Sequence, residues 1–130
     1  MSFSDIEGAP VIRVSKPPFD QLESFVNSEL SEDDGTAVKK SRIADIALAV
    51  GIKEETRVDS IEDSEQTFNL GSVDNYGVLK TIIEERHPDA APDELRSLLV
   101  EYLEGGLQEI SEQIENEGVF RYHEYLDYDD

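Results

Sequence analysis

The residues most clearly suited to binding a ligand are six cations, which occupy two stretches of the chain with almost no acids. Residues 8–19 hold two of these cations and no acid, and residues 36–53 hold the other four beside a single aspartate. Lysine and arginine side chains neutralise phosphate groups and release counterions, which gives an affinity for nucleic acid that is independent of base sequence. The candidate DNA-binding residues are Arg13, Lys16, Lys39, Lys40, Arg42 and Lys53.

The charge of the rest of the chain makes these two stretches unusual. The 130 residues include 31 acids and 11 bases, which gives a formal net charge of −20. The two cationic stretches sum to +2 and +3, so the remainder of the chain carries −25. A second interpretation of the six cations stays open beside DNA binding, in which they offset local repulsion or pair with nearby acids.

Three explanations of the acidity compete: an acidic tail or DNA-mimicking surface, disorder, and adaptation to molar salt. In molar salt, carboxylates keep a protein surface hydrated, and their mutual repulsion is screened to about 3 Å. The acids are spread along almost the whole chain, and lysine is scarce, with only five residues. We therefore expect a halophilic protein, which is an inference about its host and not about its activity.

The sequence offers no arrangement of residues that is typical of an active site. It has no cysteine, which excludes disulfides, zinc–thiolate sites and cysteine nucleophiles. His87 precedes Pro88 at an expected helix end, where we expect it to be solvated or bonded to a carbonyl, and His123 stands alone. The patterns of a calcium-binding loop and of a phosphate-binding glycine loop are missing. We therefore predict no enzyme activity, no metal and no cofactor.

The first half of the chain predicts a short strand and two helices. Residues 11–14 favour a strand, and the two prolines that follow suit the first turn of a helix entered at Ser15 or Lys16. A second helix, capped by Thr36, is expected to end near Gly51. Apolar residues recur at helical spacing in both helices. These positions are Phe19, Leu22, Phe25, Val26 and Leu30 in the first helix, and Ile43, Ile46, Ala47 and Val50 in the second.

The second half predicts two more helices after a polar surface loop. Residues 67–70 are expected to form a brief strand or a turn, Asp74 to cap a third helix, and the residue before Pro88 to end it. A fourth helix begins a few residues later and keeps its apolar period for more than five turns. The pair Gly105-Gly106 lies inside this helix at a cost of about 2 kcal/mol relative to alanine. The pair therefore marks either a break or a close contact with another helix.

These elements predict one mainly α domain, a compact arrangement of about four helices with a short N-terminal β-strand. We expect residues 1–10 to form a flexible leader, residues 11–118 the helical domain, and residues 119–130 an acidic, aromatic tail. The strand followed by two helices is similar to the start of a ribbon-helix-helix protein. No stretch approaches the roughly 18 apolar residues of a membrane span, and no signal-peptide pattern is visible, so we expect a cytoplasmic protein with no membrane partner.

Several short motifs, taken in order, resemble the DndE family of DNA phosphorothioation proteins, in a haloarchaeal form. Each motif is short, and it is their order and spacing over residues 11–114 that carry the resemblance. The chain departs from the family in its much greater acidity and in an extended acidic loop at residues 31–35. The matching segments are Ile12-Arg13-Val14-Ser15-Lys16, Asp20-Gln21-Leu22, Arg42-Ile43-Ala44-Asp45-Ile46-Ala47-Leu48, Thr67-Phe68-Asn69-Leu70, Asp74-Asn75-Tyr76 and Gly106-Leu107.

The resemblance implies a compact helical protein that self-associates, as a homo-oligomer such as a tetramer. It also implies membership of the machinery that replaces a non-bridging phosphate oxygen of DNA with sulfur, and therefore the other subunits of that complex as partners. In this family the protein is a non-catalytic subunit that binds DNA, notably nicked or modified duplex, through surface lysines. At the matching positions that role falls to Lys16, Lys39, Lys40 and Arg42.

Two other classes of function remain as alternatives. A ribbon-helix-helix regulator would read the major groove with paired strands, which requires polar side chains along the outward face of the strand. In residues 11–14 only Arg13 meets that requirement. The second alternative is a protein-interaction adaptor or DNA mimic that uses the acids as its contact surface.

Overall fold

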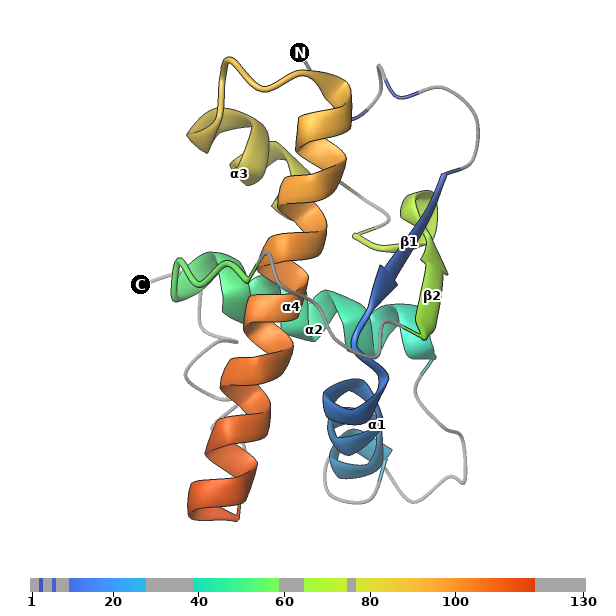
Figure 1. The fold of residues 1–130 in the computed structure, drawn as a ribbon, viewed down its shortest axis with the longest axis vertical. Helices are drawn as coiled ribbons and strands as arrows, with labels where there is room; N and C mark the ends of the chain where they lie inside the picture. The colour runs from blue at the N-terminus through green and yellow to red at the C-terminus, as the bar shows by residue number, and fades with distance from the viewer. Residues whose placement is uncertain are drawn as a thin grey trace.

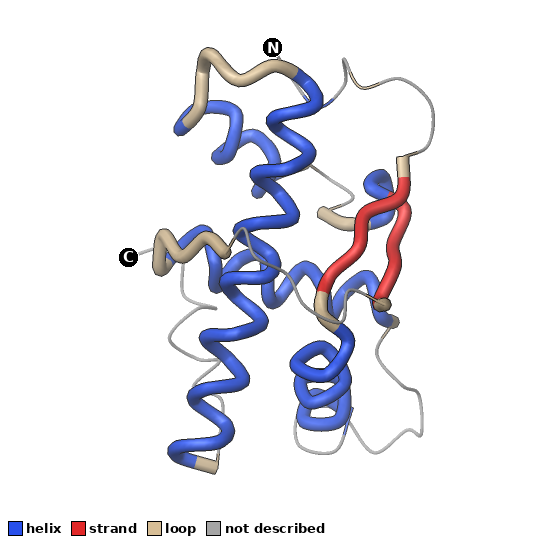
Figure 2. Tube along the Cα trace, in the orientation of Figure 1, coloured by secondary structure: helices blue, strands red, loops and turns tan. Residues whose placement is uncertain are grey.

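The computed structural model describes residues 3, 6, 10–27, 39–58, 65–74 and 77–118. This part of the chain is mainly helical and has four α-helices beside a two-stranded antiparallel sheet, as Figures 1 and 2 show. The predicted fold class, with its short N-terminal strand, is confirmed. In chain order the elements are β1 (Val11–Val14), α1 (Lys16–Phe25), α2 (Lys40–Lys53), β2 (Gln66–Asn69), the 3-10 helix η3 (Leu70–Ser72), α3 (Val78–Arg86) and α4 (Pro92–Glu117).

The small sheet joins the start of the chain to its middle. β1 pairs antiparallel with β2, so that Ile12 lies opposite Phe68. Alternate residues of a strand point to opposite faces of the sheet. Ile12 and Val14 are accordingly buried, whereas Val11 and Arg13 are exposed. The expected brief strand at residues 67–70 is confirmed as β2, which begins and ends one residue earlier.

Helix α1 follows β1 directly and packs mainly against α4 and α2. It is preceded by Ser15, as expected, and has proline in its first turn. Phe19 and Leu22 are fully buried, and the Phe19 ring meets the Phe68 ring edge-on with the centroids 5.3 Å apart. The helical spacing of the apolar residues therefore identified the buried side of this helix correctly.

The centre of the molecule is the crossing of α2 and α4, which Figure 1 shows with α4 lying across α2. At Gly106 an added Cβ would lie 1.7 Å from the Ala47 carbonyl oxygen, and at Gly51 it would lie 1.8 Å from the Tyr102 carbonyl oxygen. Only glycine allows the two backbones to approach so closely. Since α4 runs unbroken through Gly105 and Gly106, the glycine pair marks a close helix contact and not a break.

Two acidic residues of the described part of the chain are buried, Asp74 and Glu104, and Glu104 lies inside the core. Glu104, on α4, is fully buried, and its Oε1 accepts a hydrogen bond of 2.9 Å from the Ser15 backbone N–H. Its Oε2 accepts a second bond, 3.1 Å long, from Gln108 Nε2. A buried carboxylate is tolerated when it is hydrogen-bonded, and negative charge is favourable beside a helix N-terminus. Glu104 therefore fixes the start of α1 against the middle of α4.

Two boundaries differ from the sequence-based expectation. The second helix begins at Lys40, with Lys39 in the capping position, and not in the turn after Thr36, which lies outside the described residues. It continues to Lys53, beyond the glycine where its end was expected. That glycine does not stop the helix because the crossing with α4 requires a small residue there.

The segments beyond the core were expected to be a leader and a tail. Of the leader, Phe3 and Ile6 are half-buried against the core, and the Phe3 backbone N–H donates to Glu84 Oε2 at 2.7 Å. The expected tail at residues 119–130 lies outside the described residues. Among the residues that are described, no helix is long and apolar enough to cross a membrane.

Candidate nucleic-acid interface

The N-terminal turn of α2 combines positive charge with unused backbone donors. Lys39, in the capping position, has an extended backbone and supplies no side-chain cap, and the first turn contains no acid. Within the described part of the chain, the backbone N–H groups of Lys40 and Ser41 have no hydrogen-bond partner. Free N–H groups and the helix dipole make such a terminus attractive to anions.

Lys40 leans over α1 from this turn. Its ammonium lies 2.9 Å from Glu23 Oε2 and 5.5 Å from the centre of the Phe19 ring. About half of the Lys40 side chain remains exposed. An ion pair at such a surface contributes about 0–1 kcal/mol, so the ammonium stays accessible to a competing phosphate.

Lys16 extends the same cationic surface onto α1. It lies one turn before Phe19, the residue that Lys40 covers, and it pairs with Asp20 at 3.2 Å. Lys39 is exposed and makes no ion pair within the described residues. Lys39 and Lys40 therefore lie at the start of α2, with Lys40 against α1, and Lys16 lies at the start of α1.

Arg42 has a more structural position than the sequence suggested. Its guanidinium pairs with Asp45 at 2.9 Å through Nη1 and donates to the Ser72 carbonyl oxygen at 3.3 Å through Nη2. Asp45 Oδ1 in turn accepts a bond of 2.6 Å from the Asp74 backbone N–H. Burial raises the pKa of Asp45 above its usual value, although the Asp74 N–H and the Arg42 charge act in the opposite direction.

Asp74 continues this chain of contacts to α3. Its Oδ2 accepts the backbone N–H of Lys80, in the first turn of α3, at 2.7 Å, while Gly77 occupies the capping position itself. The expectation that Asp74 is the capping residue of this helix is therefore wrong, because the helix begins later in the chain, although the Asp74 side chain still accepts an N–H of its first turn. Lys80 Nζ donates to the Leu70 carbonyl oxygen at 3.0 Å, and burial lowers the pKa of Lys80.

The two remaining candidate residues lie apart from this surface. Arg13 projects from the exposed face of the β1–β2 sheet. Lys53 is the last residue of α2, about 20 Å along the helix from Lys40 at the helical rise of about 1.5 Å per residue. The structure thus places four of the six candidates at the starts of α1 and α2, and the other two on β1 and at the last residue of α2.

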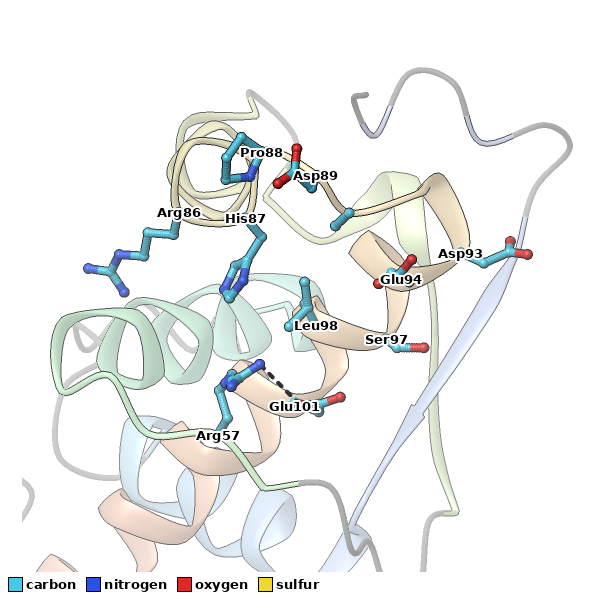
Figure 3. Close-up of a pocket in the computed structure, with 11 residues that line it drawn as sticks. Arg57, Arg86, His87, Pro88, Asp89, Asp93, Glu94, Ser97, Leu98 and Glu101 are labelled. Carbon is cyan, nitrogen blue, oxygen red and sulfur yellow. Dashed lines mark ion pairs between the residues drawn. The ribbon is translucent and has the colours of Figure 1, made fainter.

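A polar depression on another part of the surface was not predicted from the sequence. It has a volume of about 650 Å³, and Figure 3 shows Arg57, Arg86 and His87 on one side of it and acids on the other. His87 was expected to be solvated or bonded to a carbonyl; it is half-buried, and its Nε2 lies 3.0 Å from Tyr102 Oη. Arg86 donates to the Ile52 carbonyl oxygen at 2.8 Å, which closes the end of α2. No sequence signal links these residues because they come from separate elements.

One candidate chemistry can be checked against the described residues, the binding of a metal ion. They include no group of three or more histidine, cysteine, aspartate or glutamate side chains placed to hold a metal ion. Comparison with known proteins adds no further guide, since no protein-family model, no curated protein and no solved structure matches this chain.

Proposed function

We propose that this protein is a non-catalytic DNA-binding subunit of a DNA phosphorothioation system. The observation that carries the proposal is the N-terminal turn of α2, where Lys39 and Lys40 meet backbone N–H groups that have no partner among the described residues, in a first turn without acids. The assignment to DNA phosphorothioation is based on the motifs that resemble, in order and spacing, those of the DndE family. In a chain of net charge −20, such a turn is the most suitable surface for a phosphate backbone.

The proposed contact is made to phosphates and not to base edges. Lys16, Lys39 and Lys40 are single point charges near two helix starts, which suits the DNA backbone. Arg42 bonds to Asp45 and to the Ser72 carbonyl, so it helps to hold the N-terminal turn of α2 in place. Affinity is therefore expected to depend strongly on salt and little on base sequence.

The test compares two single substitutions at opposite ends of α2. Lys39→Gln removes one positive charge from the proposed contact. Lys53→Gln removes an equal charge at the other end of α2, about 20 Å along the helix. We expect Lys39→Gln to weaken binding to nicked duplex DNA by about 1 kcal/mol at low salt and to reduce the salt slope by about one unit. Lys53→Gln is expected to leave both quantities close to the wild-type values.

The same binding assay separates the alternatives. Equal affinity of the wild-type protein and Lys39→Gln would remove α2 as the contact surface. A strong preference for one base sequence would favour the ribbon-helix-helix regulator, although only Arg13 among the outward side chains of β1 is suited to reading bases. Failure to bind DNA at any salt, together with stable capture of a partner protein, would favour an acidic adaptor.

A further inference from the structure

The polar depression of Figure 3 has opposite charges at its two ends. At one end, beside the last turn of α2, Arg57 and Arg86 lie with a single acid, Glu101. At the other end, where α4 begins, the described lining residues include three acids and no base, namely Asp89, Asp93 and Glu94. The formal charges therefore sum to +1 at the first end and to −3 at the second, within a volume of about 650 Å³.

An apolar floor lies between the two ends. Glu94, Leu98 and Glu101 follow one side of α4, because residues three and four apart are neighbours on a helix surface. Leu98 is buried between the two acids, and Figure 3 shows the His87 ring directed toward it from the end of α3. His87 is held in this position by Tyr102, whose Oη lies 3.0 Å from Nε2. The two acids that flank Leu98 are about 10 Å apart along the helix axis.

Arg57 supplies hydrogen-bond donors at the positive end. Its position beside α4 is fixed, because the Val58 N–H donates to the Glu101 carbonyl oxygen at 3.1 Å. The Arg57 guanidinium lies 3.6 Å from Glu101 Oε1, which is longer than the about 2.7–2.9 Å of a charge-assisted hydrogen bond. Within the described residues the Arg57 side chain makes no hydrogen bond, and 44% of it is exposed. Such a guanidinium suits a carboxylate, which accepts two parallel N–H bonds.

Glu94 supplies an acceptor at the negative end. Its Oε1 lies 3.4 Å from the Ala91 backbone nitrogen, and its Oε2 has no partner in the part of the chain that the structure describes. Neither Glu94 nor Asp93 pairs with a base among these residues. An ionised carboxylate without a cation beside it is a strong acceptor for an ammonium group.

We propose that this depression binds a linear zwitterion, which is a molecule with a carboxylate at one end of an apolar chain and an ammonium at the other. The carboxylate contacts Arg57, the apolar chain crosses Leu98, and the ammonium contacts Glu94. A ligand with only one charge makes only one of the two polar contacts and therefore binds more weakly. The depression lies away from the N-terminal turn of α2, so the inference does not depend on the proposed DNA contact.

High salt separates this site from the general charge of the chain. A chain of net charge −20 attracts any amine at low salt, but molar salt screens such attraction beyond about 3 Å. Charged groups in direct contact at a partly buried site are screened much less. Binding in molar KCl therefore reports the depression and not the net charge.

The first experiment titrates the full chain with four small molecules in molar KCl and follows its amide NMR shifts. The probes are 6-aminohexanoate, glycine, hexanoate and hexylamine. Glycine has both charged groups but is too short to reach both ends, whereas the last two probes have one charge each. We expect saturable shifts at residues 86–101 with 6-aminohexanoate, and a dissociation constant about tenfold or more lower than for the other three. Equal affinity for any of the other three, or no saturable shift, would overturn the proposal.

The second experiment removes one charge from each end of the depression. Arg57→Gln and Glu94→Gln are each expected to raise the dissociation constant of 6-aminohexanoate about tenfold. Glu94→Gln keeps the oxygen that faces the Ala91 nitrogen, and circular dichroism establishes that both variants are folded. The matched controls are Arg13→Gln, on β1, and Glu112→Gln, on an exposed part of α4, and both are expected to bind as the wild type does.

The affinity for hexanoate locates the two ends. Arg57→Gln should weaken the binding of hexanoate, whereas Glu94→Gln should leave it unchanged, because hexanoate has no ammonium group. Equal weakening of 6-aminohexanoate by a variant and by its matched control would overturn the proposal, since that result assigns the binding to net charge. An unchanged affinity in Arg57→Gln would overturn it as well.

Discussion

Helix α2 makes two contacts that depend on different physical effects. Across its middle and C-terminal half it packs on α4 through backbone surfaces, with Gly51 against Tyr102 and Gly106 against Ala47. At its N-terminal half it reaches η3 and α3 through Arg42, Asp45 and hydrogen bonds. The first contact depends on the absence of side-chain volume, and the second on matched charges and donors. We therefore expect a single mutation to lower the free energy of unfolding by a large amount at the first contact, and by smaller amounts that depend on the lost hydrogen bond or charge at the second.

The largest effect is expected at the glycine crossing. Gly106→Ala places a methyl group 1.7 Å from the Ala47 carbonyl oxygen, so α2 and α4 must separate. We expect the free energy of unfolding to fall by about 3 kcal/mol, measured by denaturant titration in molar KCl. Gly71→Ala is the control, because an added Cβ there meets nothing within 4 Å, and it should change stability by less than about 0.5 kcal/mol. Similar losses in both variants would show that the crossing has no special intolerance of volume.

A smaller effect is expected at Asp74, which belongs to the second contact and links α2 to α3. Asp74→Ala removes the acceptor of the Lys80 N–H and leaves alanine at a φ of 52°. Loss of a helix cap and a left-handed backbone at a residue with a Cβ cost about 2 kcal/mol together. Asp74→Asn keeps an acceptor oxygen and tolerates this backbone conformation, so it should lose about half as much or less.

Amide hydrogen exchange locates the Asp74 effect. Faster exchange confined to α3 in Asp74→Ala is the expected pattern, because the bond that is lost holds only the first turn of that helix. Exchange that rises equally in α4 would contradict the separation of the two contacts.

The smallest effect is the pH dependence of Asp45. Burial raises its pKa in the folded protein, so the folded state binds this proton more tightly than the unfolded state does. The resulting stabilisation is complete below the unfolded pKa and is lost as the pH rises through the folded pKa. Wild type should therefore lose stability relative to Asp45→Asn as the pH is raised from about 3 through the acid range above the ordinary pKa of aspartate, by less than about 1 kcal/mol. A difference that stays constant with pH, or that grows in favour of wild type, would contradict the raised pKa.

The elements of this fold were predictable because their periodicity is local. Buried positions such as Leu22 and Val50 recur at helical spacing, and proline and histidine mark the end of α3. The start of α2 was placed too early because Thr36 is a favourable cap in isolation, whereas the helix begins only at Lys40. A helix limit set by packing against distant residues has no local signal.

The candidate site was predictable in composition but not in geometry. Charge counting found the cationic start of α2, but it left open whether Arg42 contacts DNA or pairs with a nearby acid, as it does with Asp45. The Arg42 partners include Ser72, which is 30 residues away, and no spacing rule indicates that contact. The same limit applies to Gly105-Gly106, where the sequence showed that a close contact was possible and the fold supplied Ala47 as the partner.

The bond between the Ser15 N–H and Glu104 joins residues 89 positions apart. During synthesis, the N-terminal strand and α1 leave the ribosome long before the residue that fixes them has been added. The beginning of the protein must therefore wait, incompletely assembled, until most of the chain has been translated.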